Sequence, residues 1–223
     1  MVSTGLEELD RLLQDGYPDR STILVAGPPG VGKEALGYWF THSGLIQNDF
    51  CLYATTLGVS EVLRDFRAYH VNVEKKVPFW IASDGGQVKC DVNDLAGLSF
   101  NIKETLRKNN TSRRTRIVTD VLSSLLMLNP PDSVYRFLSQ LFSEIKQHDA
   151  VFLATIEEGM HQPNILASME QLFDGVIELR LYEKGMRLIP LLRVKKMRGS
   201  APQPVYFHFS FDQGRMEINS LAK

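Results

Sequence analysis

Apolar and polar residues alternate along most of the chain in two patterns. Short apolar runs are typical of buried parallel strands, and longer stretches with an apolar residue at every third or fourth position are typical of helices. The short runs predict strands at residues 23–26, 51–55, 79–82, 117–120 and 151–155. The amphipathic stretches lie before, between and after these strands, so the pattern predicts a β–α alternation.

Helix signals separate these predicted strands. The clearest helix starts at Asp132 or Ser133, because apolar residues then return at positions i, i+3, i+4, i+7, i+8 and i+11. Ser60 is predicted to cap an earlier helix, and Asn93 or Asp94 to cap the one after it. The other predicted helices lie at residues 6–13, with Ser3 or Thr4 as the cap, from Lys33 onward, and at residues 165–173.

From Gly175 the pattern changes to strand-like segments without helices between them. These segments are residues 176–181, 186–193 and 205–211, and the Glu-Lys-Gly sequence at 183–185 is typical of a hairpin turn. Consecutive strands joined by short turns pair in antiparallel fashion. The sequence therefore predicts an α/β fold in one domain, residues 1–223, with a mostly parallel sheet flanked by helices and antiparallel C-terminal strands.

Composition and charge are ordinary for a globular protein. The 223 residues are 43% hydrophobic and 23% charged, and the net charge of −1 gives no global attraction for nucleic acid or acidic membranes. No apolar run approaches the roughly 20 residues of a membrane span, and the N-terminus lacks a charged-then-apolar signal segment, so we expect a cytoplasmic protein. Cys51 and Cys90 make no disulfide framework, and the five histidines show no metal-ligand spacing.

The strongest chemical signal is a glycine-rich segment between the strand at 23–26 and the next helix. A strand, a glycine-rich turn and a helix start in this order are the context of a phosphate-binding loop, whose backbone N–H groups point at an anion beside a helix N-terminus. The lysine of such a loop reaches the β- and γ-phosphates. The predicted nucleotide-binding residues are Gly27, Pro28, Pro29, Gly30, Val31, Gly32, Lys33 and Glu34.

Glu34 departs from this motif, which closes with a Ser or Thr whose hydroxyl holds Mg²⁺. One interpretation is repulsion: a carboxylate about 4 Å from a phosphate oxygen costs on the order of 4 kcal/mol at an effective dielectric near 20, or about three orders of magnitude in affinity. A second is that Glu34 coordinates Mg²⁺ directly, since the ion prefers oxygen ligands. A third is a salt bridge with Lys33 or Arg198 that fills the site.

Asp120 ends the apolar run at residues 117–120. In a P-loop fold an acid at this edge of the sheet holds the water shell of Mg²⁺. An Asp that ends a strand is also a common turn former. Beside a phosphate-binding loop, the metal role is favoured.

Taken in order, five segments resemble the RecA superfamily and, within it, the single-domain KaiC-like ATPases common in archaea. They cover nearly the whole chain: Ser3-Thr4-Gly5 with Leu9-Asp10, the loop at 27–33, Tyr53-Ala54-Thr55-Thr56, Asp120-Val121-Leu122-Ser123-Ser124-Leu125 and Lys196-Met197-Arg198-Gly199-Ser200. The resemblance implies a RecA-type core that binds ATP and Mg²⁺ at subunit interfaces. It also implies a homo-oligomer, usually a hexameric ring or a helical filament.

The same resemblance gives roles to single residues. It assigns the phosphates to Lys33 and the metal to Asp120 through water. Glu157 falls where the superfamily often keeps a polar residue that senses the γ-phosphate, and an ordinary loop acid is the equal alternative. Lys196 and Arg198 match residues that reach the γ-phosphate of a neighbouring subunit, with a solvated basic edge strand as the equal alternative.

The catalytic acids of the family are missing. In KaiC-like proteins a pair of acids follows the second strand and activates the attacking water, but this chain has Leu57 and Gly58 there. Glu61, one helical turn further on, is expected to be solvated near a helix N-terminus. General-base assistance is worth about 10²–10⁴ in rate, so we expect ATP hydrolysis to be slow or absent. The predicted function is a nucleotide-binding, oligomerising module that acts in regulation or as a scaffold, alone or with a protein partner.

Two other functions stay open at this point. One is an active ATPase completed by an acid from a neighbouring chain. The other is a DNA-binding recombinase paralogue, which the near-zero net charge and the lack of an aromatic stacking platform disfavour. Its basic surface would consist of Lys108, Arg113, Arg114 and Arg116.

Overall fold

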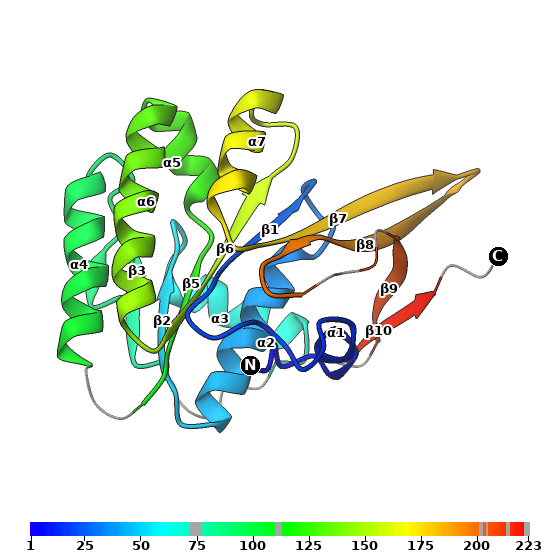
Figure 1. Cartoon of the computed structure of the whole chain (residues 1–223), viewed down its shortest axis with the longest axis horizontal. Coiled ribbons are helices and arrows are strands. Elements are labelled where there is room, and N and C mark those ends of the chain that lie inside the picture. The colour runs from blue at the N-terminus through cyan, green and yellow to red at the C-terminus, as the bar shows by residue number, and fades with distance from the viewer. Residues whose placement is uncertain (72–76, 110–112, 201–202, 204, 213–214, 221–223) are drawn as a thin grey trace.

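The strands of the protein form one sheet with helices on both faces (Figure 1). The structure is a computed structural model that describes residues 1–71, 77–109, 113–200, 203, 205–212 and 215–220. The strands are β1 (Thr22–Gly27), β2 (Phe50–Ala54), β3 (Phe79–Ala82), β4 (Val88–Lys89), β5 (Thr115–Thr119), β6 (Ala150–Glu157), β7 (Gly175–Lys184), β8 (Arg187–Met197), β9 (Phe207–Asp212) and β10 (Arg215–Ser220). The helices are α1 (Glu7–Leu12), α2 (Lys33–Ile46), α3 (Val59–Ala68), α4 (Leu95–Lys108), α5 (Leu122–Leu128), α6 (Pro131–Gln147) and α7 (Pro163–Leu172).

Strand order places the phosphate-loop strand in the middle of the sheet. The order is β10-β9-β8-β7-β1-β6-β5-β2-β3-β4. All pairs from β7 to β4 are parallel, and β7 through β10 pair in antiparallel fashion. The α/β fold with a mostly parallel sheet and antiparallel C-terminal strands, predicted from the sequence, is confirmed.

Each face of the sheet has its own apolar core. Side chains of α1, α2 and α3 pack on one face with Val25 and Ile177, and side chains of α4 to α7 pack on the other with Leu24 and Ala26 (Figure 1). Neighbouring residues of β1 thus point to opposite faces and are buried on both, as the continuous apolar run predicted. The phosphate loop leaves the end of β1 between these two layers.

Several predicted helix starts are wrong by one to three residues. The N-cap of α3 is Gly58 and not Ser60, because the Glu61 carboxylate accepts the Gly58 N–H at 2.8 Å and so caps the helix without a serine. Helix α6 starts at Pro131, before the predicted Asp132 or Ser133, since proline suits the first helical position. The predicted cap of α4 is confirmed: of Asn93 and Asp94, Asp94 is the N-cap and accepts the Gly97 N–H at 2.8 Å.

The first helix is also capped differently from the prediction. Leu6 holds the N-cap position of α1 without a side-chain hydrogen bond. The Thr4 hydroxyl accepts the Leu6 N–H at 3.1 Å, and the Ser3 hydroxyl accepts the Gly5 N–H at the same distance. Ser3 and Thr4 therefore shape the turn before the helix rather than cap it.

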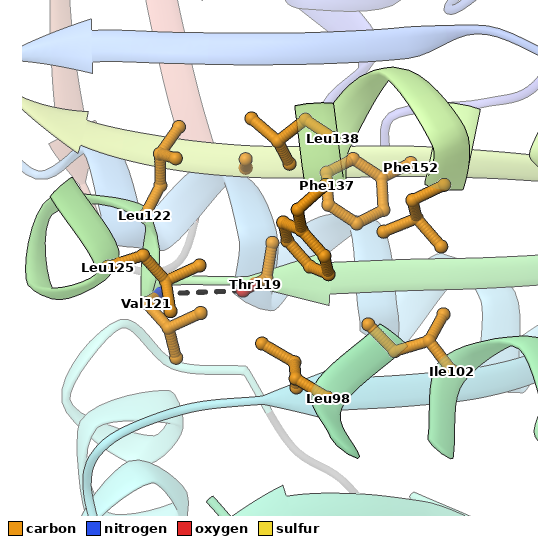
Figure 2. Close-up of a pocket in the computed structure, with 11 residues that line it drawn as sticks. Leu98, Ile102, Thr119, Val121, Leu122, Leu125, Phe137, Leu138 and Phe152 are labelled. Atoms are coloured by element: carbon orange, nitrogen blue, oxygen red, sulfur yellow. Dashed lines mark hydrogen bonds between the residues drawn. The ribbon is translucent and has the colours of Figure 1, made fainter. Parts of the chain in front are cut away.

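Between α4, α5, α6 and the sheet lies an apolar cavity that is too small for a ligand (Figure 2). Its volume is about 10 Å³, about the space that one water needs. Its one marked polar contact is a hydrogen bond of 3.4 Å from the Val121 N–H to the Thr119 hydroxyl. The cavity is packed core, lined by Leu98, Ile102, Thr119, Val121, Leu122, Leu125, Phe137, Leu138, Leu141, Phe152 and Ala154.

Candidate functional site

The loop between β1 and α2 has the backbone shape of an anion-binding turn. Gly30 and Gly32 have φ angles of 76° and 88°, which residues with a side chain rarely adopt. Gly32 is the N-cap of α2, so the loop leads directly into a helix N-terminus with its partial positive charge. A Cβ atom built on Gly30 would meet no described atom within 4 Å. The two glycines therefore have the backbone angles that such a turn requires, and the space beside Gly30 is open.

Lys33 is buried beside two carboxylates. Its side chain is 1% exposed, and its Nζ atom lies 2.8 Å from Glu34 Oε1 and 2.6 Å from Glu157 Oε1. These ion pairs lack the angles of hydrogen bonds, so Lys33 Nζ has no hydrogen-bond partner among the described residues. Glu157 reaches Lys33 because β6 pairs with β1 in a register that sets Glu157 opposite Gly27. Of the three interpretations of Glu34, the structure contains the salt bridge to Lys33.

Asp120 stands at the end of β5, two strands from the loop. The Asp120 N–H donates to the Ala54 carbonyl at 3.1 Å, and the Thr55 hydroxyl donates to Asp120 Oδ2 at 3.2 Å. Burial raises the pKa of Asp120 to about 7, with the Thr55 hydrogen bond lowering it and the Glu34 charge raising it further. Among the described residues, no cation offsets this rise in pKa, so a cation bound at Asp120 would stabilise its charged form.

Unpartnered buried atoms test whether nucleotide and Mg²⁺ fit this site. Lys33 Nζ, Asp120 Oδ1 and Glu157 Oε2 are all buried and lack a hydrogen-bond partner within the described part of the chain. A cationic donor and carboxylate oxygens are the groups that phosphate and Mg²⁺ would satisfy. No group of three Asp, Glu, His or Cys side chains among the described residues could hold a metal alone. An ion at Asp120 would therefore take its other ligands from water or from phosphate oxygens, and the residues present fit the pair.

The positions of the missing acids lie just after β2. Leu57 is 40% exposed, and the Gly58 N–H is held by Glu61. Glu61 is exposed in the first turn of α3, as expected, and its carboxylate also caps the helix by accepting the Gly58 N–H. Its carboxylate is committed to the backbone, so it does not replace the missing general base in this arrangement.

Two residues that sequence reasoning missed lie beside Glu157. The Ser123 hydroxyl accepts the Glu157 N–H at 2.9 Å and lies 3.1 Å from His161 Nε2. Burial lowers the pKa of His161, and the Glu157 charge opposes this only in part, so the imidazole is mainly neutral at neutral pH. Ser123 lies in the first turn of α5 and His161 in the loop after β6, so the available signal was their position shortly after Asp120 and Glu157, at the ends of adjacent strands.

Lys196 and Arg198 do not share one target within the chain. Lys196 Nζ donates to the carbonyls of Glu170 and Gln171 at 3.1 and 3.0 Å, and to the carbonyl at the C-cap of α7, Phe173. Arg198 is 61% exposed and donates to Asp174 Oδ1 at 3.0 Å. Lys196 therefore satisfies the C-terminal carbonyls of α7, and its contact with a neighbouring subunit stays a prediction, as does that of Arg198.

The basic cluster proposed for DNA binding is only partly a surface. Arg116 is fully buried and donates to Asp49 Oδ2 at 2.7 Å, so its inclusion in that surface was wrong. Arg114 pairs with Asp19 and Asp149. Strand alternation explains the error, because Arg116 points from β5 into the layer beneath α2, where its Nη1 reaches the Phe40 carbonyl at 3.1 Å.

The sheet order, the loop and the buried lysine together define a P-loop nucleotide-binding fold of the RecA type. A family model described as "ATPase: KaiC" matches residues 2–222. The chain therefore belongs to the KaiC ATPase family, within the RecA superfamily of P-loop ATPases. This confirms the resemblance inferred from the sequence.

Relatives of this chain include UPF0273 proteins and a circadian clock protein. The chain is 27% identical over 220 residues to a UPF0273 protein of Sulfurisphaera tokodaii, covering 89% of this chain and 75% of the relative. It is 28% identical over 220 residues to a UPF0273 protein of Thermotoga maritima, and this match covers 90% of this chain and 88% of the relative. It is 26% identical over 225 residues to the circadian clock protein KaiC3 of Synechocystis, covering 97% of this chain but 43% of that protein.

Within the described ranges, no helix combines the length and apolar composition that crossing a membrane requires.

Proposed function

We propose that this protein is a KaiC-family module that binds ATP weakly, hydrolyses it slowly or not at all, and assembles with copies of itself in a regulatory or scaffold role. The observation that carries the proposal is the pair of carboxylates on Lys33. Glu34 and Glu157 both lie within 3 Å of the ammonium group that would meet the phosphates. The glycines of the loop have the φ angles that a phosphate-binding turn requires, and Lys33, the cation of the loop, already pairs with two carboxylates.

The effect on affinity follows from charge. To bind a triphosphate, Lys33 must exchange carboxylate contacts for phosphate contacts, while Glu34 stays in the first turn of α2. A carboxylate about 4 Å from a phosphate oxygen opposes binding by on the order of 4 kcal/mol at an effective dielectric near 20. A Mg²⁺ ion between the two would reverse the sign of this effect, because Glu34 would then become an oxygen ligand.

Slow turnover follows from the residues around the loop. Bound Mg²⁺ would neutralise charge on the phosphate oxygens, with Asp120 holding its water shell and Lys33 the phosphates. No carboxylate follows β2 at Leu57 or Gly58, so this chain offers no acid there to take a proton from the attacking water. The loss of a general base costs about 10²–10⁴ in rate.

Self-assembly is supported by the exposed cation after β8. Arg198 projects with most of its surface in water, although a partner in its own chain, Asp174, is within reach. An arginine is suited to bidentate contact with phosphate across an interface. Lys196 has its ammonium group on α7, so in the proposed assembly Arg198 is the residue that reaches the neighbour's nucleotide.

Isothermal titration calorimetry with Mg-ATP tests the proposal on wild type and on Glu34→Thr. Glu34→Thr restores the hydroxyl of the motif and is expected to bind Mg-ATP at least about tenfold more tightly. Glu183→Thr makes the same chemical change on an exposed part of β7 and is the matched control. A phosphate-release assay should show wild-type turnover far below about 1 s⁻¹, the low end for working enzymes. Turnover of wild type at that rate, or unchanged affinity in Glu34→Thr, contradicts the proposal.

A further inference from the structure

The hairpin of β7 and β8 extends beyond the other strands of the sheet (Figure 1). Within the described residues, β1 pairs with β7 as far as Glu178, and the outer part of β7 pairs only with β8. This outer part of the hairpin, the ribbon, consists of residues 180–190. Residues 180–188 are all exposed, so neither helix layer covers this end of the hairpin.

Large apolar side chains are exposed along the ribbon. Leu181 is 37% exposed, Tyr182 56% and Leu188 63%, and Met186 at the turn is fully exposed. Neighbouring residues of a strand point to opposite faces, and directly opposite partners share a face. Leu181 and Leu188 therefore lie on one face of the ribbon and Tyr182 on the other. Apolar surface that is exposed on both faces of one element indicates a binding surface.

The ribbon carries cations beside these apolar side chains. Lys184 and Arg187 lie directly opposite each other next to the turn, and both are exposed. Arg180 is 53% exposed and pairs with the buried Glu178. Glu183 is the one acid in the sequence of residues 180–190, so the ribbon has an excess of positive charge and is attracted to an acidic surface.

The arrangement of these side chains favours a lipid bilayer over a protein or a nucleic acid strand. A flat partner covers one face of the ribbon, whereas a bilayer surrounds any element that enters it. In a protein groove, Lys184 and Arg187 would each need a paired acid. At a bilayer their charged ends can reach the lipid phosphates while the apolar side chains enter the boundary of the acyl chains.

The dimensions of the ribbon fit a shallow position in the headgroup layer. From Leu181 to the turn at Gly185 the strand spans about 13 Å, and interfacial elements bury their apolar side about 5–10 Å deep. In the described structure, the outer edges of the two strands have no strand partner along the ribbon. Unpaired backbone groups need water, which the headgroup layer supplies and the hydrocarbon core does not. The ribbon can therefore enter this layer without crossing the membrane.

We propose that the ribbon binds the surface of an acidic membrane. Lys184 and Arg187 contact the lipid phosphates, and the exposed apolar side chains of the ribbon enter the headgroup layer. Tyr182 suits this depth, because its ring is apolar and its hydroxyl is polar. The inference goes beyond the proposed function and requires no nucleotide on the phosphate loop.

Sedimentation with lipid vesicles tests the proposal on the full chain. The probes are vesicles of phosphatidylcholine alone and vesicles that also contain phosphatidylglycerol, an anionic lipid. Wild type is expected to bind the acidic vesicles at least about tenfold more tightly, because each Lys or Arg near an acidic surface contributes about fivefold. The assay contains no nucleotide, so its outcome is independent of the Mg-ATP titration.

Two double variants separate the apolar and the cationic contributions. Met186→Ser with Leu188→Ser removes apolar surface and should weaken binding to acidic vesicles about tenfold or more. Lys184→Gln with Arg187→Gln should weaken binding to a similar extent and abolish the preference for acidic lipid. All four positions are exposed, so the urea midpoint of each variant should stay close to that of wild type.

Matched double variants elsewhere on the surface are the controls. Met127→Ser with Leu128→Ser changes the same residue types on α5, where the two side chains are 59% and 58% exposed. Arg107→Gln with Lys108→Gln changes the same cations on α4, where they are 60% and 77% exposed. Neither control should change vesicle binding by more than about twofold.

Other results decide against the proposal. If wild type binds neither kind of vesicle, or binds both equally, the ribbon is not a site for acidic membranes. Equal loss in the controls means that general surface charge, and not the ribbon, binds the vesicles. Loss in the cationic variant alone means that the ribbon contacts phosphate without entering lipid, as it would on a single-stranded nucleic acid. If the apolar variant binds vesicles as wild type does but forms smaller assemblies in light scattering, the ribbon is a contact between copies of this chain.

Discussion

Lys33 Nζ lies 2.6 Å from Glu157 Oε1, which joins the first residue of α2 to the last residue of β6. The two residues meet because β1 and β6 are parallel neighbours with Gly27 opposite Glu157. A buried ammonium group is costly unless it is paired. Without a nucleotide, Glu157 and Glu34 therefore stabilise the loop by the same contacts that compete with a phosphate.

Glu157→Gln should strengthen nucleotide binding. The substitution keeps the size of the side chain and removes one of the two charges that neutralise Lys33. We expect Mg-ATP to bind about tenfold more tightly. A unit negative charge a few ångström from a phosphate makes the binding free energy less favourable by about 1 kcal/mol or more, even near a protein surface. Calorimetry measures the change. Glu158→Gln is the matched control, because Glu158 lies among Glu178, Arg180 and Lys195 instead. Weaker binding in Glu157→Gln would show that the carboxylate serves the bound nucleotide or its metal.

Substitution of Arg116 should lower the stability of the fold more than substitution of most other residues. It is fully buried, and its guanidinium donates to Asp49, Gln47 and the carbonyls of Ser3 and Phe40 at distances of 2.7–3.1 Å. Removal leaves the nearly buried Asp49 carboxylate without its partner. Arg116→Met is expected to lower the free energy of unfolding by about 3–5 kcal/mol, measured by urea denaturation.

A surface arginine provides the comparison for that measurement. Arg67 is exposed on the last turn of α3, and Arg67→Met should change stability by less than about 0.5 kcal/mol. Arg116→Lys keeps the charge but lacks the planar fork, so it should remain clearly destabilised. A loss below about 1 kcal/mol in Arg116→Met would mean that the network contributes little.

The parts of the fold that follow from local pattern were predictable. Five strands of the parallel region, namely β1, β2, β3, β5 and β6, appear in the sequence as apolar runs, the loop as a glycine motif, and α6 as a long amphipathic repeat. Strands β4 and β10 were missed because β4 has two residues and β10 carries only Met216 and Ile218 as an apolar alternation. Their pairing with β3 and β9 fixes them, and pairing is not local in the sequence.

The sequence predicted which residues belong to the candidate site, but it did not predict which of them contact one another. Lys33, Glu34, Asp120 and Glu157 were all identified, but the ion pair to Glu157 depends on strand order, which no local pattern gives. Arg116 shows the same limit. Arg116 follows a basic connector in the sequence, and its burial becomes visible only from the packing of α2. Gly44 of α2 leaves the space for the Arg116 side chain, because a Cβ atom at Gly44 would lie 2.6 Å from Arg116 Cδ.

Glu178 should make the free energy of unfolding depend on pH in the acidic range. The side chain is 1% exposed, and it receives hydrogen bonds from Arg180, Arg193 and Tyr206 at 2.7–2.9 Å. Burial raises its pKa, but the Tyr206 hydrogen bond and the two arginines outweigh this, and the net pKa lies below the ordinary 4.5. A carboxyl group with a depressed pKa stabilises the fold above its unfolded pKa, and this contribution is lost as pH falls through the folded value.

Urea denaturation of wild type and Glu178→Gln over a pH series checks this. At neutral pH the variant should be less stable by about 1–3 kcal/mol, since hydrogen bonds to charged groups are lost. The difference should stay constant down to the ordinary pKa of 4.5 and shrink below it, where wild type becomes protonated. A difference that does not change across that window would mean that the carboxylate charge is not what stabilises the fold.

Substitutions at Lys196 and Arg198 should affect different properties of the protein. The Lys196 substitution should lower stability, and the Arg198 substitution should reduce assembly. Lys196 donates to three backbone carbonyls at the end of α7, groups that a helix leaves without partners. Lys196→Met is therefore expected to lower the free energy of unfolding by about 1 kcal/mol, as loss of a cation at a helix C-terminus does. Arg198 is mostly in water, and Arg198→Met should change stability by less than about 0.5 kcal/mol.

Assembly is measured by light scattering after size exclusion, with and without Mg-ATP. Here Arg198→Met should have the larger effect and Lys196→Met the smaller one, the reverse of their effects on stability. Arg198→Met removes the exposed cation that would contact a neighbour's phosphates, so nucleotide-dependent assembly should fall. Lys196→Met should assemble as wild type does, because its ammonium group is bound within its own chain. Loss of assembly in Lys196→Met with unchanged stability would show that Lys196 leaves α7 in the assembly and serves the interface. Equal assembly of both variants and wild type would remove Arg198 from the interface and leave its pairing with Asp174 as its role.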